Sequence, residues 1–140
     1  MSLETNKAVV KRYFVEVLDG GRRDVMAELF HAGAPQHFPS RDLTFDPASA
    51  GSRAYQTMRT TLHHLLADGD YVVAHLTHVV SYSSPAAFVT QLGSVDTSGR
   101  RVHWDAVAIF RMQAGKIAEE WVNRDELSIL SQLDALALRS

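Results

Sequence analysis

The chain has 140 residues, of which 46% are hydrophobic and 21% charged, with a net charge of -2 and no cysteine. This length is typical of one domain, covering 1–140, and no stretch approaches the roughly 20 apolar residues that span a bilayer. The lack of cysteine excludes disulfides, thiolate catalysis and the common structural zinc sites. Nucleic-acid binding normally needs a basic stripe, which is absent. We therefore expect neither nucleic acid nor a membrane as a partner.

The first half of the chain is mostly helical in its pattern. Apolar residues recur at helical spacing from Leu3 to Leu18, and Gly20-Gly21 supplies a stop; a second, short helix follows over 25–30. Prolines at positions 35, 39 and 47 then predict an extended segment and a loop that ends at Ala50. The spacing predicts a third helix, marked by Tyr55, Met58, Leu62, Leu65 and Leu66.

The second half changes to the period of strands. Residues 71–82, 88–95 and 101–112 are rich in Val, Thr and aromatic side chains, and a hairpin at Ala114-Gly115 leads into another strand over 117–123. Asp125 can cap a closing helix. Short turns between consecutive strands favour antiparallel pairing, so the pattern predicts an α+β domain.

The motifs and their order are similar to those of one known family. They are Asn6 to Phe14, Gly20-Gly21, Glu28-Leu29-Phe30, Asp68-Gly69-Asp70, Ile109-Phe110-Arg111, Gly115-Lys116-Ile117 and Glu119-Glu120-Trp121. This arrangement resembles the SnoaL-like polyketide cyclases, which share the nuclear transport factor two fold with ketosteroid isomerase and scytalone dehydratase. The resemblance implies a cone-shaped roll in which helices pack on a strongly curved antiparallel sheet and enclose a cavity for a small ligand.

The resemblance also assigns positions on the cavity wall. The positions that carry polar groups in the family fall here on Ala106, Ala108 and Val122. The position of Val122 resembles the one that holds the acid/base Asp in SnoaL-type cyclases. Ala108 stands where the cyclases have a His and ketosteroid isomerase has a protonated Asp. Since a methyl group cannot transfer a proton, the family's usual aldol-cyclase chemistry is in doubt for this chain.

Strand alternation predicts the remaining wall. We expect the following residues to face the cavity: Trp104, Phe110, Val73, His75, Thr77, Val79 and Glu120. We expect His78, Asp105 and Trp121 to face away.

Few polar residues remain as candidates for chemistry. Tyr13 lies on the inner face of the first helix, where it resembles the oxyanion-stabilising tyrosine of ketosteroid isomerase. Gln36 and His37 follow the second helix, near the position of that isomerase's proton-shuttling Asp. A tyrosine that donates and a histidine that titrates near neutral pH, with Glu120 as an optional third group, would suffice for enolisation, isomerisation or dehydration. Tyr13 and His37 are the predicted catalytic pair.

Each candidate also has a structural interpretation. Tyr13 is at core spacing, and His37 could merely hydrogen-bond a loop carbonyl. A single His in an apolar strand, such as His75, is more often a buried hydrogen-bonded residue than a base. Glu120 would be solvated if the strand register were one residue off.

The seven histidines do not have metal-binding spacing. His75 and His78 fall on opposite faces of a strand, and His63 and His64 diverge on the predicted third helix. No phosphate-binding glycine pattern occurs. We therefore expect no metal and no cofactor.

Two functions stay open. One is a cofactor-independent cyclase, isomerase or dehydratase acting on a polyketide-like or other cyclic ketone; the other is a non-catalytic carrier or sensor of a small apolar ligand. The outer sheet face, expected to carry Leu76, His78, Val80, Val107, Ile109 and Trp121, predicts a homodimer. The N-terminal residues show no export signal, which favours the cytoplasm.

Overall fold

A computed structural model describes residues 2–49 and 54–137; Ala50, the end of the expected loop, lies outside the described residues. The helical elements are α1 (Leu3–Arg12), a π-helical segment (Tyr13–Asp19), a 3-10 turn (Arg23–Val25), α2 (Met26–Leu29) and α3 (Glu126–Gln132). The strands are β1 (Pro35–His37), β2 (Asp42–Thr44), β3 (Thr57–Asp68), β4 (Tyr71–Ser81), β5 (Ala87–Thr90), β6 (Gly93–Asp96), β7 (Arg101–Gln113) and β8 (Lys116–Arg124).

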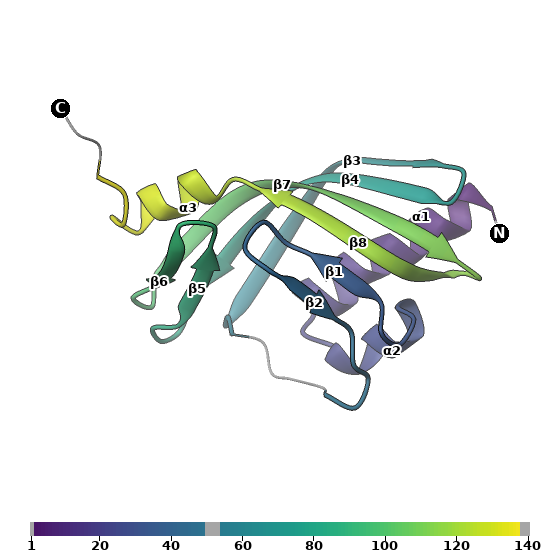
Figure 1. Ribbon diagram of the computed structural model, residues 1–140, viewed down its shortest axis with the longest axis horizontal. Coiled ribbons are helices and arrows are strands. Elements are labelled where there is room, and N and C mark those ends of the chain that lie inside the picture. Colours follow the sequence, from purple (N-terminus) through teal and green to yellow (C-terminus); the bar gives the residue numbers. More distant parts are fainter. Residues whose placement is uncertain (1, 50–53, 138–140) are drawn as a thin grey trace.

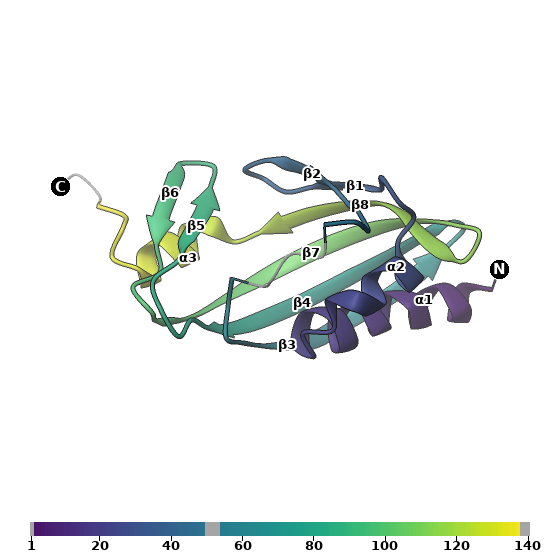
Figure 2. The same ribbon diagram turned by 90° about the horizontal axis from the view of Figure 1, so that it is seen from below.

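The main sheet has six strands in the order β2-β1-β8-β7-β4-β3, and β5 and β6 form a separate hairpin. Its neighbouring strands run antiparallel except β1 and β8, which are parallel. The sheet is bent, and α1 and α2 lie together on one side of it, while α3 and the β5–β6 hairpin lie at the far end (Figures 1 and 2). This arrangement confirms the predicted α+β class with a curved, mostly antiparallel sheet. No helix in the described part of the chain has the length and apolarity of a membrane span.

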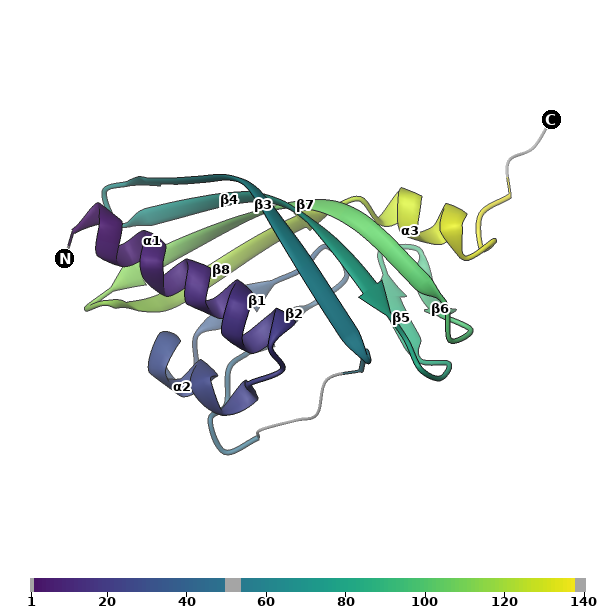
Figure 3. The same ribbon diagram turned by 180° about the vertical axis from the view of Figure 1, so that it is seen from behind.

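The first helix runs across the sheet (Figure 3) and is bounded as the sequence predicts. The Ser2 hydroxyl caps its start by accepting a hydrogen bond from the Thr5 backbone N–H at 3.0 Å. Its second half widens into the π-helical segment and ends at Gly20, where a Cβ would lie 2.7 Å from the Glu16 carbonyl oxygen. Glycine is therefore required at this helix end.

The predicted third helix is wrong, because residues 57–68 form strand β3. A β-bulge between Leu62 and His64 leaves His63 with no residue of β4 directly opposite it in the strand register. The extra residue turns a spacing of two into a spacing of three, so Met58, Leu62 and Leu65 face the core at intervals of four and three. Those intervals are also the ones of a helix, and the bulge therefore produced a false helical pattern.

The predicted register of β4 is wrong by one residue. Ala74 lies directly opposite Ala108 of β7, and residues that pair directly share a face of the sheet. The buried residues of β4 are accordingly Val72, Ala74, Leu76, His78 and Val80. Val73, His75, Thr77 and Val79, which were expected on the cavity wall, lie on the outer face instead. Both faces of β4 carry valines, so hydrophobicity alone did not distinguish them.

Candidate functional site

A cavity of about 130 Å³ lies between the π-helical segment and the covered face of the sheet. Most of its lining is apolar, and the polar groups are few. It is lined by Tyr13, Phe14, Leu18, Phe38, Met58, Leu76, His78, Trp104, Ala106, Ala108, Glu120, Val122 and Arg124. We call this space the inner cavity.

Glu120 brings a carboxyl group into the inner cavity from β8. The residue is 2% exposed, and its Oε1 accepts a hydrogen bond of 2.8 Å from Nε2 of Gln36. No cation among the described residues forms a salt bridge with it. Burial therefore raises the pKa of Glu120 to about 7, and the Gln36 hydrogen bond offsets this only in part. A carboxyl with this pKa can both accept and return a proton near neutral pH.

Tyr13 approaches the same region from the π-helical segment. Its ring packs edge-on against Phe30, with ring centroids 4.9 Å apart. Burial raises the pKa of Tyr13 well above its ordinary value, and the negative charge of Glu120 adds to this, while a hydrogen bond from Gln36 acts in the opposite direction. The phenol thus stays protonated, and Tyr13, Gln36 and Glu120 form one linked group.

His78 lines the inner cavity from β4, where sequence reasoning placed it on the other face. Its Nδ1 lies 2.7 Å from the Thr60 hydroxyl, which donates its own proton to Oδ1 of Asp19 at 2.7 Å. The hydroxyl proton is thereby used, so Nδ1 of His78 must be the donor and Nε2 keeps its lone pair. Burial and the charge of Arg124 lower the pKa of His78 to about 4, which keeps the ring neutral.

His37 does not meet Tyr13 in the inner cavity. Gln36 and His37 are successive residues of β1, so their side chains point to opposite faces of the sheet. Because Gln36 points toward the inner cavity, His37 points away from it. The His37 ring stacks on Trp121, and its Nδ1 and Nε2 lie 2.9 Å from Asp42 and 2.7 Å from Glu119. Hydrogen bonds with Glu119 and Asp42 raise the pKa of His37. The structure therefore does not support the predicted catalytic pair.

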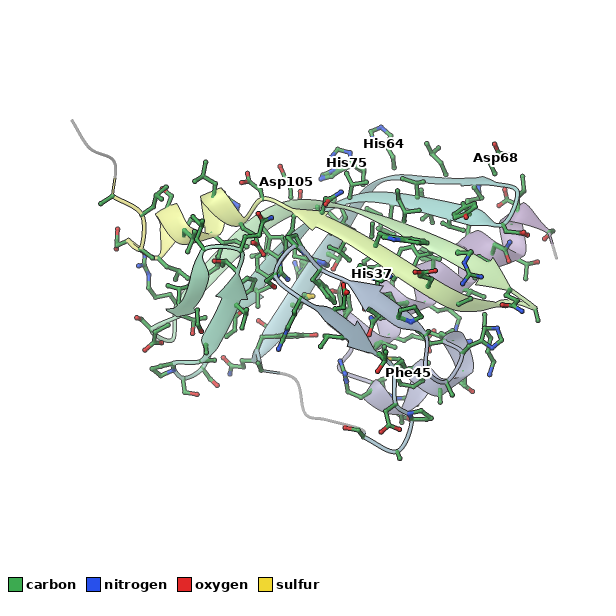
Figure 4. All side chains as sticks on the ribbon, in the orientation of Figure 1. His37, Phe45, His64, Asp68, His75 and Asp105 are labelled. Carbon is green, nitrogen blue, oxygen red and sulfur yellow. The ribbon has the colours of Figure 1, made fainter. Side chains whose placement is uncertain are left out.

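His75 also lies outside the inner cavity, on the sheet face away from α1 and α2 (Figure 4). Its ring stacks on that of His64, with the two Nδ1 atoms 3.0 Å apart, and the bulge turns His63 to the same face. The prediction that His63 and His64 diverge assumed a helix, and it is wrong because these residues lie on strand β3. Among the described residues, no group of three or more His, Asp or Glu side chains is placed to hold a metal ion.

The other predicted wall positions divide into two groups. Trp104, Ala106, Ala108, Glu120 and Val122 line the inner cavity as alternation predicts. Phe110 is fully buried beneath it and packs against the rings of Tyr13 and Phe14, and Gln36 acts through its hydrogen bond to Glu120. Sequence reasoning missed His78 and Thr60. The pairing of β4 with β7 shows the face of His78, and the pairing of β3 with β4 places Thr60 opposite it.

A larger recess of about 340 Å³ lies between β5 and α3, but its ionisable groups are already engaged. Nε of Arg124 donates to Oε2 of Glu126 at 2.9 Å, and the Asp125 carboxylate caps α3 through the Ser128 N–H. The inner cavity is therefore the better candidate site, because the polar side chains that line it, such as Glu120 and His78, still have atoms that can hydrogen-bond a ligand.

The helices packed on one side of a bent, mostly antiparallel sheet define an α+β protein of the nuclear transport factor two type. A family model described as a SnoaL-like domain matches residues 10–120. The chain belongs to the SnoaL-like family. No curated protein matches the sequence.

Solved structures with low sequence identity share the fold. The chain is 22% identical to TsrD from Streptomyces laurentii, with a TM-score of 0.74 over 97% of this chain and 99% of that one. A SnoaL-like polyketide cyclase from Agrobacterium tumefaciens has 18% identity and a TM-score of 0.69, covering 95% and 99%. An epoxide hydrolase of the LEH-like type from M. tuberculosis has 12% identity and a TM-score of 0.73, covering 94% and 90%.

Proposed function

We propose that this protein binds a small, mostly apolar ketone in the inner cavity and transfers a proton on it without a cofactor. The observation that carries the proposal is Glu120, a buried carboxyl with a pKa of about 7 facing an apolar space. Acidic side chains whose pKa is shifted far from its ordinary value, and which lie in a cleft, are typical of catalytic sites. The names of the structural relatives, a polyketide cyclase and an epoxide hydrolase, support a small-molecule reaction of this general kind.

The proposed chemistry is enolisation. The Glu120 carboxylate removes a proton from the carbon beside the carbonyl, and the electron pair of that C–H bond moves to the carbonyl oxygen. Tyr13 donates a hydrogen bond to the resulting enolate oxygen, which lowers the energy of the charged intermediate. Protonated Glu120 then returns the proton to a different carbon in an isomerisation, or to a departing hydroxyl, lost as water, in a dehydration. In a cyclisation the enolate carbon would attack a second carbonyl carbon of the ligand, the π electrons of that carbonyl would move to its oxygen, and protonated Glu120 would give its proton to that oxygen.

His78 has a different part in the proposal. With a pKa of about 4 it is uncharged at neutral pH, and its free Nε2 can accept a hydrogen bond from a ligand hydroxyl. Thr60 and Asp19 fix the ring orientation, so this acceptor is in place before the ligand arrives.

The second candidate function is a carrier or sensor without catalysis. Ala106, Ala108 and Val122 present only hydrocarbon on the wall opposite the π-helical segment, which favours binding over chemistry. The two functions differ in what Glu120 does. In a carrier its carboxyl only binds, and changing it alters affinity without altering any rate of proton exchange.

The test is solvent deuterium exchange at the carbons beside the carbonyl of cyclohexanone and tetralone, followed by proton NMR in heavy water. We expect Glu120→Gln to slow exchange by about a hundredfold to ten-thousandfold, and Tyr13→Phe by about tenfold to a thousandfold. His37→Ala is the matched control, because it removes an ionisable group on the far face. Wild-type exchange no faster than buffer, or full exchange in Glu120→Gln, would contradict the enzyme proposal and favour the carrier.

We also propose that the outer sheet face packs against a second copy of the chain. Val107 and Ile109 are 40% and 37% exposed there, and Trp121 shares their face. Leu76, His78 and Val80, which were expected on this face, are buried on the other side. The cytoplasm stays a prediction for the location of the protein, which fractionation of the source cells would test.

A further inference from the structure

A second hollow of about 290 Å³, which we call the outer chamber, adjoins the inner cavity. The two spaces share Leu18, Met58, Trp104 and Arg124 as lining residues. The outer chamber is also lined by Arg23, Arg41, Ala54, Tyr55, Tyr82, Ala87, Phe88 and Val89. Three arginines thus line it, and no acidic side chain of the described residues does.

Arg124 forms a fixed wall between the two spaces. Its guanidinium lies over the rings of Phe88 and Phe38, 4.8 and 5.3 Å from their centroids. Its Nε donates to Glu126 at 2.9 Å and its Nη2 to the Val89 carbonyl at 3.1 Å. Glu126 therefore offsets part of this charge, and the rigid guanidinium mainly shapes the chamber.

Arg23 and Arg41 carry uncompensated charge. Arg23 comes from the 3-10 turn and Arg41 from the turn between β1 and β2, and neither forms a salt bridge with any residue that the structure describes. By contrast, Arg12, Arg22, Arg100 and Arg111 each pair with a carboxylate. Arg59 and Arg101 also form no salt bridge with any described residue, but neither lines the chamber, whose lining is positive although the chain as a whole has a net charge of -2.

We propose that the ligand is an amphipathic carboxylate, with its apolar part in the inner cavity and its carboxylate in the outer chamber between Arg23 and Arg41. Guanidinium groups match carboxylates in shape and can bind them with two parallel hydrogen bonds. The proposal rests on the inner cavity being a ligand site. It also sets the orientation of the ligand, because the negative end is kept away from Glu120 and the reacting carbon is placed beside it.

The two adjoining spaces meet two different requirements of the proposed ligand. Proton transfer needs a carboxyl shielded from water, which Glu120 supplies in the inner cavity, whereas recognition of an anion needs accessible positive charge, which the outer chamber supplies. An anion next to Glu120 would repel its carboxylate form and prevent it from acting as a base. The inner cavity and the outer chamber together have the size of a small-molecule site.

The experiment compares matched pairs of probes by isothermal titration: naphthoate with acetylnaphthalene, and benzoate with acetophenone. Each pair has the same ring and nearly the same shape, and differs in charge. We expect the acids to bind about tenfold or more tightly than the ketones, and this preference to shrink when ionic strength rises from about 0.05 M to about 0.5 M. The Arg23→Gln/Arg41→Gln double variant should lose the preference, and the Arg23→Lys/Arg41→Lys variant should keep part of it.

The Arg59→Gln/Arg101→Gln double variant is the charge-matched control, since Arg59 lies on β3 and Arg101 on β7, and neither lines either space. Circular dichroism melting would establish that every variant is folded. If acids and ketones bind equally, or if the double variant keeps the preference, the anion proposal is overturned while the ligand site stands. If no probe of either pair binds, the ligand site itself fails, and the anion proposal fails with it.

Discussion

At the scale of single residues, the raised pKa of Glu120 ties the proposed proton transfer to the stability of the fold. Its pKa is about 7 in the folded chain against an ordinary 4.5, so the folded state holds the proton more tightly than the unfolded state does. The stability from the protonated group is complete below pH 4.5 and is lost as the pH rises to about 7. The loss amounts to about 3 kcal/mol, as an order of magnitude.

Glu120→Gln should therefore stabilise the protein at pH 8 and change little at pH 4, in urea unfolding followed by fluorescence. The amide keeps an oxygen for the Gln36 hydrogen bond and has no charge to bury. Glu119→Gln is the control, because the pKa of Glu119 is lowered by its hydrogen bond with His37 and the sign of its effect is opposite. Equal stability of Glu120→Gln and wild type at pH 8 would show that the Glu120 carboxyl is not desolvated.

The second residue-scale prediction concerns the tautomer of His78. Nitrogen-15 NMR should show the proton on Nδ1 and a bare Nε2, because the Thr60 hydroxyl proton is already donated to Asp19. Thr60→Val should remove this preference and cost about 1–3 kcal/mol of stability, since the buried Nδ1 of His78 and Oδ1 of Asp19 lose the hydroxyl, while Oδ2 of Asp19 keeps its hydrogen bond from the backbone N–H of residue 60. Thr60→Ser should retain both. A proton found on Nε2 in the wild type would refute the proposed role of His78.

Several of these residues could be placed from the sequence and others could not. Tyr13 and Glu120 follow from alternation and helical spacing within one element. His37 and His78 depend on which face of a strand points inward, and a shift of one residue reverses that answer. The hydrogen bond between His78 and Thr60 joins two strands, so no local pattern contains it.

At the scale of elements, the bulge in β3 makes a paired prediction. His63 is the residue with no register partner on β4, so its deletion leaves Leu62, His64 and Leu65 in regular alternation, with the same side chains facing the core. We expect this variant to fold, with a loss of stability of about 1–2 kcal/mol.

Deleting Thr77 from β4, which has no extra residue, should prevent folding because it exchanges the faces of half the strand. Circular dichroism and thermal melting of both variants would decide. Unfolding of the His63 deletion would show that the bulge is required.

The elements differ in how far the sequence determined them. α1, β7 and β8 carry clear periods between strong turn signals, and they form as predicted. β3 does not, because the bulge disguises its period. The parallel pairing of β1 with β8 joins segments far apart in the chain, and only the tertiary structure reveals it.

At the scale of the whole molecule, the exposed outer face makes the dimer testable. Multi-angle light scattering at micromolar concentration should give twice the mass of the chain for the wild type. Ile109→Asp should give the mass of a monomer, since it places a charge in the apolar part of that face. Leu92→Asp is the control, because Leu92 is 75% exposed on the turn between β5 and β6, away from the main sheet. A monomeric wild type would end the dimer proposal.

The attachment of β1 to β8 has a consequence for the acidity of the site. Gln36 pairs with Glu120 in the backbone register and also hydrogen-bonds its carboxyl, so detaching the β1–β2 hairpin would let water reach that group. In water its pKa would fall back toward 4.5. Protonation of Glu120 and closure of the hairpin are therefore linked. The free energy needed to open the hairpin falls as the pH rises from 4.5 to about 7. Opening of this edge of the sheet and protonation of Glu120 are two coupled equilibria, and amide hydrogen exchange in β1 measured against pH reports on both.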